Sequence, residues 1–141
     1  MSGGSRDAFM TADGGLTHTL GMVREEITPQ RVVISMPVTP RLHQPTGLLH
    51  GGASLALAES AASVAGNLNC AEGFVALGQE INANHLRGIS EGTLRATATP
   101  VHIGRRSQVW SVDIVDENGK MICVSRVTLA VVPATPIKSA D

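Results

Sequence analysis

The sequence predicts an α+β domain in which a curved antiparallel sheet wraps one buried helix. Residues 52–68 consist mainly of Ala and Leu, the strongest helix formers, and are apolar on nearly every side. Most of the remaining chain consists of short segments that are rich in β-branched residues or alternate polar with apolar residues, separated by turn residues. A helix without a polar face has to be covered, and several antiparallel strands can cover it.

Length and composition exclude several classes of protein. The chain has 141 residues, of which 43% are hydrophobic and 16% charged, so it is long and apolar enough to form a core. Aromatic residues make up only 2% and the net charge is −1, which argues against a nucleic-acid or membrane partner. No signal peptide and no apolar run of 18 residues is present, so we expect a cytoplasmic protein.

The elements are expected in a simple order. We expect a flexible N-terminal tail over residues 1–15, one domain over 16–133 and a C-terminal tail over 134–141. Two short strands flank Thr28-Pro29-Gln30 within residues 21–38, and residues 39–51 form a loop. After the helix, strands are expected over 74–83 (leading into 84–88), 92–103, 107–115 and 121–132. Asn118-Gly119 between the last two predicts a type I′ hairpin.

Glu59 stands out in the predicted helix. It is the only ionisable residue between Gly52 and Gly66, and burial of a lone carboxylate is costly unless the group is paired or used. Glu59 therefore lies on an exposed edge of the helix, is capped by a hydrogen-bond donor of a neighbouring group, or belongs to a functional site. Ser63, one turn further on the same face, is either a small packing residue or a partner of the carboxylate.

The sequence His50-Gly51-Gly52 at the helix start offers unpaired amide groups that can bind an oxyanion. Alternatively, the glycines only permit a tight turn and His50 is a loop histidine, with Gln44 in the same loop. Gly51 and Glu59 are eight residues apart, about 12 Å along a helix. Two groups that act on one carbonyl must both lie about 3 Å from it. If both are catalytic, two antiparallel chains must share the site, which predicts an obligate oligomer.

Basic residues concentrate between residues 84 and 107, where four Arg and two His accompany only one acidic residue. This segment fits phosphate binding as well as it fits a solvated hairpin tip. No metal is expected, because the five histidines lack helical i,i+4 spacing and Cys70 and Cys123 have no histidine neighbours. The two thiols are expected to be small buried packing groups. A G-x-S-x-G nucleophile motif is also absent.

Four stretches together resemble the hotdog-fold acyl-CoA thioesterases. They are QPTGLLHGGASLALAES from residue 44, followed by SVAG, INANHLRG and PVHIGRRSQVW. The similarity is greatest to the branch of 1,4-dihydroxy-2-naphthoyl-CoA hydrolase and Arthrobacter-type 4-hydroxybenzoyl-CoA thioesterase, and it covers about residues 21–132. The resemblance implies a curved sheet around one long helix and a homodimer, which in many members of the family pairs further into a tetramer, so that dimer and tetramer both remain open. It also implies acyl-CoA hydrolysis, with coenzyme A as part of the substrate and no cofactor.

The resemblance also implies roles for individual residues. Glu59 matches the catalytic carboxylate, a nucleophile or general base, and Gly51 the amide that polarises the thioester carbonyl. Gln44 and His50 match loop residues that orient thioester and water, and Ser63 matches a hydroxyl that places water. The residues that match segments along the coenzyme A path are Gly78, His85, Leu86, Arg87, Gly88, His102, Ile103, Gly104, Arg105, Arg106 and Ser107.

Two other functions remain open on the sequence. A module that binds acyl-CoA without cleaving it would be expected to lack the helix carboxylate, whereas Glu59 is present. A hotdog dehydratase would need a histidine and an acid in a different arrangement. The branch favours an aromatic acyl group, and 1,4-dihydroxy-2-naphthoyl-CoA is the best single expectation for the substrate.

Overall fold

The computed structural model describes residues 14–134, so most of both predicted tails lies outside the described residues. Two α-helices, one 3₁₀ turn and six strands follow in sequence. In chain order they are α2 (Gly15–Thr19), β1 (Val23–Ile27), β2 (Val32–Val38), η1 (Pro40–Leu42), α3 (Gly51–Leu68), β3 (Phe74–His85), β4 (Gly92–Ile103), β5 (Ser107–Val115) and β6 (Met121–Pro133).

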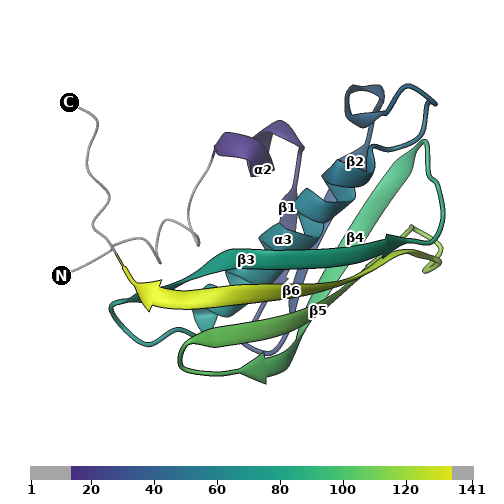
Figure 1. The fold of residues 1–141 in the computed structure, drawn as a ribbon. Coiled ribbons are helices and arrows are strands. Elements are labelled where there is room, and N and C mark those ends of the chain that lie inside the picture. Colours follow the sequence, from purple (N-terminus) through teal and green to yellow (C-terminus); the bar gives the residue numbers. More distant parts are fainter. Residues whose placement is uncertain (1–13, 135–141) are drawn as a thin grey trace, which may run out of the picture.

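One antiparallel sheet curves around α3 (Figure 1). Its strand order is β1-β2-β4-β5-β6-β3, so β1 and β3 form the two edges. Helix α3 contacts strands β2 to β6, and its fully buried residues include Leu57, Ala58 and Ala61. The predicted α+β class, with a sheet wrapped around one helix, is confirmed.

Most predicted elements are confirmed to within two residues, and two local predictions are wrong. The short helix α2 begins at Gly15, where we expected no element. At the β5–β6 turn only Gly119 has a positive φ, of 77°, whereas a type I′ turn needs positive φ at both central residues. The Gly119 N–H donates to the Asp116 carbonyl at 3.0 Å, and the Asp116 side chain accepts from the Asn118 and Lys120 amides. Asp116 thus favours a three-residue loop with glycine in the left-handed position.

Small residues bring the second half of α3 very close to the sheet. A Cβ added to Gly66 would lie 2.3 Å from Leu129 Cδ1 and 2.9 Å from Gln108 Oε1. Gln108 itself is buried, donates to the Gly66 carbonyl at 3.2 Å and accepts from Trp110 Nε1 at 2.8 Å. The close approach therefore depends on the missing side chain at position 66, and a buried hydrogen-bond network holds it.

Asn67 connects α3 to the edge strand β3. Its side chain is fully buried, accepts from the Ala76 N–H at 3.0 Å and donates to the Ala76 carbonyl at 3.0 Å and the Ser63 carbonyl at 2.8 Å. The side chain thus closes the open edge of β3 at Ala76, as a neighbouring strand would. Beyond Ala76, the rest of this edge pairs with no strand among residues 14–134.

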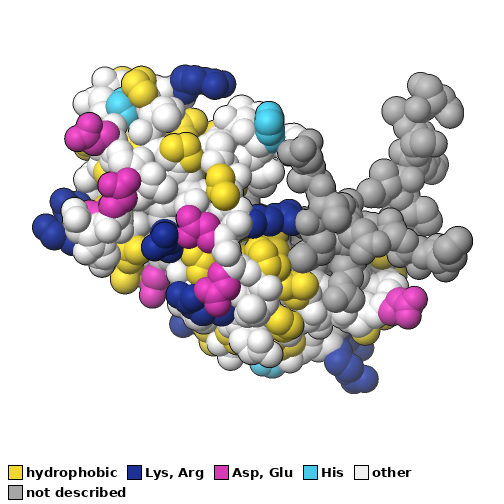
Figure 2. Space-filling model, turned by 180° about the vertical axis from the view of Figure 1, so that it is seen from behind, with side chains coloured by type: hydrophobic (Ala, Val, Ile, Leu, Met, Phe, Trp, Pro, Cys, Tyr) yellow, Lys and Arg dark blue, Asp and Glu magenta, His cyan; other side chains and the backbone are white. Residues whose placement is uncertain are grey.

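The surface carries no large patch of one charge in the view of Figure 2, where basic and acidic side chains lie next to one another. Cys70 and Cys123 are buried and form no disulfide, and burial raises the pKa of the Cys123 thiol. Neither α2 nor α3, the two α-helices between residues 14 and 134, combines the length and the apolar character that a membrane-spanning helix requires.

Replacing Asn67 tests the connection between α3 and β3. Asn67→Leu keeps the branched side-chain shape but leaves the buried N–H and carbonyl of Ala76 without partners, so we expect the free energy of unfolding to fall by about 2–3 kcal/mol. The exposed Asn82→Leu on the same strand is the control and should change it by less than about 0.5 kcal/mol. Urea unfolding of both variants measures the difference, and equal small changes would contradict the role given to Asn67.

Candidate active site

His50 determines which amide is left unpaired at the start of α3. Its Nδ1 accepts a hydrogen bond from the Gly52 N–H at 2.8 Å, and its carbonyl accepts from the Ala53 N–H at 3.0 Å. The imidazole hydrogen must then lie on Nε2. The Gly51 N–H has no acceptor among residues 14–134. His50 therefore acts as an N-cap that leaves one amide donor, at Gly51, for a ligand.

Two loops lie next to this helix end. The Leu49 N–H donates to the Ile89 carbonyl at 2.7 Å, and His43 Nε2 donates to the Ser90 carbonyl at 2.8 Å. These contacts fix the loop before α3 against the segment that follows β3.

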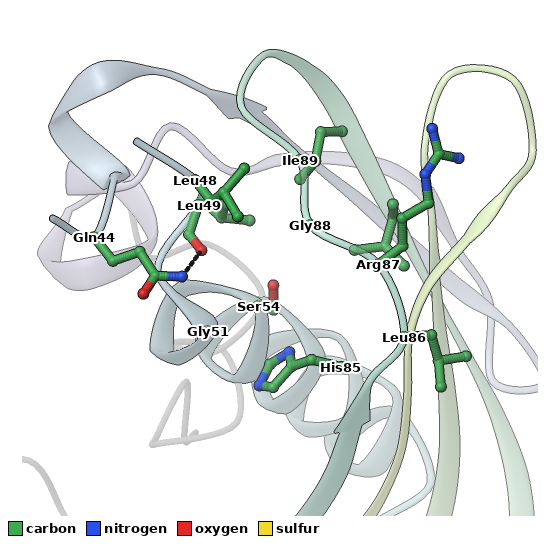
Figure 3. Close-up of a pocket in the computed structure, with 11 residues that line it drawn as sticks. Gln44, Leu48, Leu49, Gly51, Ser54, His85, Leu86, Arg87, Gly88 and Ile89 are labelled. Atoms are coloured by element: carbon green, nitrogen blue, oxygen red, sulfur yellow. Dashed lines mark hydrogen bonds between the residues drawn. The ribbon is translucent and has the colours of Figure 1, made fainter. Parts of the chain in front are cut away.

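A cavity of about 270 Å³ opens beside Gly51 between these loops (Figure 3). Its apolar wall consists of Leu48, Leu49, Leu86, Ile89 and Ile122. Its remaining lining residues are Gln44, Gly51, Ser54, His85, Arg87 and Gly88. Six residues predicted for the site therefore lie around one cavity: Gln44, Gly51, His85, Leu86, Arg87 and Gly88.

The polar lining residues differ in how they are held. Gln44 Nε2 lies 3.5 Å from the Leu49 carbonyl, and Arg87 Nη1 lies 3.4 Å from the carboxylate of Asp116. The backbone N–H of Lys120 is the main cause that lowers the pKa of Asp116, and Arg87 adds to it. The Asp116 carboxylate thus holds Arg87 at the rim of the cavity and partly balances the positive charge of its guanidinium group.

Gly51 has a steric reason to be glycine. A Cβ at this position would lie 2.8 Å from His85 Nε2, so the imidazole ring occupies the space where a side chain would point. Figure 3 shows this ring beside the first turn of α3. His85 thus lies directly beside Gly51 and not only at the rim of the cavity.

Glu59 and Ser63 lie further along α3, away from the cavity. The Glu59 side chain is half-buried and reaches under β3, where a Cβ added to Gly78 would overlap its Oε1 at 2.0 Å. Gly78 begins the irregular stretch of β3, where pairing with β6 shifts before Glu80. The structure therefore brings Glu59 and Gly78 together. Among residues 14–134, no hydrogen bond joins the side chains of Glu59 and Ser63.

The third predicted group lies at the other end of the sheet. Residues 102–107 comprise the end of β4, the turn 104–106 and the start of β5. Ser107 is level with Ala130 of β6 and Leu77 of β3. Leu77 and His85 are eight residues apart on β3, about 26 Å at the rise of a strand. Within one chain, Arg105 and Arg106 therefore lie far from the cavity, at the opposite end of the sheet from His85.

Sequence reasoning missed Ser54 and most of the apolar wall. Ser54 follows Gly51 by three residues on the helix, a spacing that places both on one face and was the available signal. The wall residues Leu49, Ile89 and Ile122 come from three separate segments, so no local pattern could have joined them. Among residues 14–134, no group of three His, Cys, Asp or Glu side chains is placed to hold a metal ion.

Comparison with known proteins identifies the family. The family model of the thioesterase superfamily matches residues 46–123, which include the helix and every lining residue of the cavity except Gln44. The chain belongs to the thioesterase superfamily, its fold is the hotdog fold, and it is a thioester hydrolase.

Three relatives illustrate the similarity. The chain is 48% identical over 120 residues to 1,4-dihydroxy-2-naphthoyl-CoA hydrolase of Escherichia coli, covering 84% of this chain and 88% of the relative. It is 44% identical over 121 residues to the proofreading thioesterase EntH of Cronobacter sakazakii, covering 86% of this chain and 88% of that one. A thioesterase structure from Haemophilus influenzae matches with a TM-score of 0.82 and 44% identity, covering 86% of this chain and 85% of that one.

Replacing Gly78 tests the contact between β3 and Glu59. In Gly78→Ala the methyl group displaces the Glu59 carboxylate, so we expect thioesterase kcat to fall by about tenfold or more, with little change in thermal stability because the Glu59 side chain can rotate away. In a Glu59→Gln background the same substitution should cost much less. Equal losses in both backgrounds, measured by steady-state kinetics, would show that Gly78 acts independently of Glu59.

Proposed function

We propose that the chain hydrolyses acyl-CoA, with the Gly51 N–H binding the thioester oxygen and Glu59 driving the attack. The observation that carries this proposal is the unpaired Gly51 N–H, which the cap by His50 leaves beside a cavity. A helix N-terminus with one free amide favours negative charge. The oxygen of a thioester carbonyl develops such a charge when its carbon is attacked.

In the proposed reaction, Glu59 acts on the carbonyl carbon in one of two ways. It removes a proton from water, which attacks the carbon, or its carboxylate attacks and water then cleaves the resulting anhydride. Both routes break the carbon–sulfur bond and give a carboxylate, a proton and free coenzyme A. Gln44 and His50 orient the thioester and the water, and Ser63 places the water beside Glu59.

We further propose that two chains share each site. Gly51 and Glu59 lie on one unbroken helix, about 12 Å apart along its axis, so a single carbonyl cannot reach both within one chain. The open edge of β3 runs beside Glu59, and Asn67 closes it only at Ala76. Antiparallel pairing of two such edges would bring Glu59 of one copy towards Gly51 of the other.

The same pairing offers a route for coenzyme A. It would bring the β4–β5 turn of one copy, with the exposed Arg105 and Arg106, towards the His85 end of the other. Neither arginine forms an ion pair with a residue among 14–134, so both are available for phosphate. A dimer of such dimers would give the tetramer expected from the resemblance.

For the acyl group we propose an aromatic acid, with 1,4-dihydroxy-2-naphthoyl-CoA as the best single substrate. Support comes from the 48% and 43% identity to hydrolases named for this thioester in Escherichia coli and Listeria monocytogenes. The apolar wall of the cavity suits such a ring.

Replacing the carboxylate tests the chemistry. We expect Glu59→Gln to lower kcat by about 10²–10³ or more while the circular dichroism spectrum stays the same. Release of free thiol is measured with benzoyl-, 4-hydroxybenzoyl-, 1,4-dihydroxy-2-naphthoyl-, phenylacetyl-, hexanoyl- and palmitoyl-CoA. Glu80→Gln, an exposed acid on β3, is the control and should retain activity. Tight binding of these thioesters by the unchanged protein without turnover would instead indicate a module that binds acyl-CoA.

Mixing two inactive variants tests the shared site. Gly51→Pro removes the N–H at the first helical position, where proline is tolerated, and His50 already has the extended ψ of 128° that a following proline needs. The proline Cβ also displaces the His85 imidazole, so Gly51→Ala, which makes the same contact but keeps the N–H, measures the effect of that displacement alone. We expect Gly51→Pro and Glu59→Gln each to be nearly inactive. Co-expressed in equal amounts, they should recover about a quarter of normal activity, because half of the dimers are mixed and each mixed dimer has one intact site of two. No recovery would place the whole site within one chain.

A further inference from the structure

Ser54 is a buried polar residue to which neither the sequence nor the resemblance gave a role. It lies on α3 three residues after Gly51, and its residue is only 2% exposed. Its hydroxyl makes no hydrogen bond with any residue between 14 and 134. Figure 3 shows the Oγ atom pointing from the helix into the cavity, towards the space between Leu48 and Gly88.

A buried hydroxyl without a partner reduces stability, so its presence needs an explanation. Ser125 is a contrasting case, a hydroxyl with a structural role: its Oγ donates a hydrogen bond to the Val112 carbonyl at 2.8 Å. Ser54 in a helix could likewise bond to the carbonyl four residues earlier, as Thr19 does with Gly15 at 3.0 Å. The orientation of Ser54 into the cavity instead leaves its hydroxyl for a ligand.

The cavity has room for part of a substrate. Its volume of about 270 Å³ falls just below the range of about 300–1,000 Å³ for complete small-molecule sites. Its wall includes the buried Leu49 and Ile122. A compact acyl group fits these dimensions better than a long flexible chain does, and Ser54 provides a hydrogen-bonding group deep among apolar side chains.

The position of Ser54 relative to Gly51 indicates which atom of the ligand it meets. Three residues correspond to about 4.5 Å along the helix, on the same face, and side chains tilt back towards the N-terminus. With the thioester oxygen on the Gly51 N–H, the Ser54 hydroxyl lies beside atoms two or three bonds from the carbonyl carbon.

We infer that Ser54 selects acyl groups that carry a hydroxyl or keto oxygen on the carbon β to the thioester carbonyl, which is the ortho position of an aromatic acyl group. The inference rests on the proposed function, because it takes the Gly51 amide as the site of the thioester oxygen. When a substrate without this oxygen binds, the Ser54 hydroxyl stays buried and unpaired in the complex. The free-energy cost of that unpaired hydroxyl makes such a substrate bind less well than one that carries the oxygen.

The experiment compares kcat/KM for benzoyl-, 2-hydroxybenzoyl- and 4-hydroxybenzoyl-CoA. We expect the unchanged protein to prefer 2-hydroxybenzoyl over benzoyl by about tenfold, and Ser54→Ala to bring that ratio close to one. The ratio of 4-hydroxybenzoyl to benzoyl should be the same in both proteins. Ser54→Ala should also keep or raise the melting temperature, because it removes an unpaired buried hydroxyl.

Ser125→Ala is the matched control. It removes a hydroxyl that has a partner within the chain, so it should lower the melting temperature and leave all substrate ratios unchanged. Dissociation constants of the three thioesters with the Glu59→Gln variant, measured by calorimetry, repeat the comparison without turnover. They decide the role of Ser54 even if the unchanged protein hydrolyses none of the three. Absence of turnover on these and on every other thioester named above would overturn the proposed function alone.

Three results would overturn the inference. One is an unchanged protein that does not distinguish 2-hydroxybenzoyl from benzoyl in binding or turnover. Another is a Ser54→Ala variant that loses the same factor on all three thioesters, which would make Ser54 a second donor to the thioester oxygen. The last is a Ser54→Ala variant with a lower melting temperature and unchanged kcat/KM ratios between the three thioesters. This result would show that the hydroxyl stabilises the fold and does not select the substrate.

Discussion

The close packing of α3 on the sheet is the constraint on which the rest of the structure depends. Alanine and glycine on the buried side of the helix, such as Ala61 and Gly66, allow contacts that any larger side chain would prevent. At this short distance the Asn67 amide can reach the backbone of the edge strand, and Glu59 can reach the place that Gly78 leaves empty. The same packing that buries the helix thus sets the position of the carboxylate.

The two ends of this helix serve different purposes. At its start, His50 Nδ1 accepts a hydrogen bond from the second amide of the helix, at Gly52. The first amide, at Gly51, stays unpaired beside a cavity whose wall comes from the surrounding loops. Near its end, Asn67 fixes the helix to β3. Because the helix is unbroken between them, the distance between Gly51 and Glu59 is fixed, which is the physical basis for the shared site proposed above.

Elements with a strong local signal were predictable from the sequence. The strands Gly92–Ile103 and Ser107–Val115 match their predicted ranges, because alternation and turn residues act over a few positions. The turn after β5 was predicted wrongly, because the pair Asn118-Gly119 was considered without the Asp116 carboxylate that bonds to two amides of the turn. The sequence does not predict the short helix α2, because Gly14 and Gly15 at its start are poor helix formers.

The sequence by itself determined the fold class, the long buried helix and the candidate residues Glu59 and Gly51, since these follow from composition and from spacing along one element. Only the tertiary structure decided which candidates lie together. It brought His85 against Gly51 and Gly78 against Glu59, and it separated Arg105 and Arg106 from the cavity by most of the length of the sheet. It also showed Ser54 facing into that cavity. The reason is that strand register and helix-to-sheet distance are set by packing between distant segments, which no local pattern encodes.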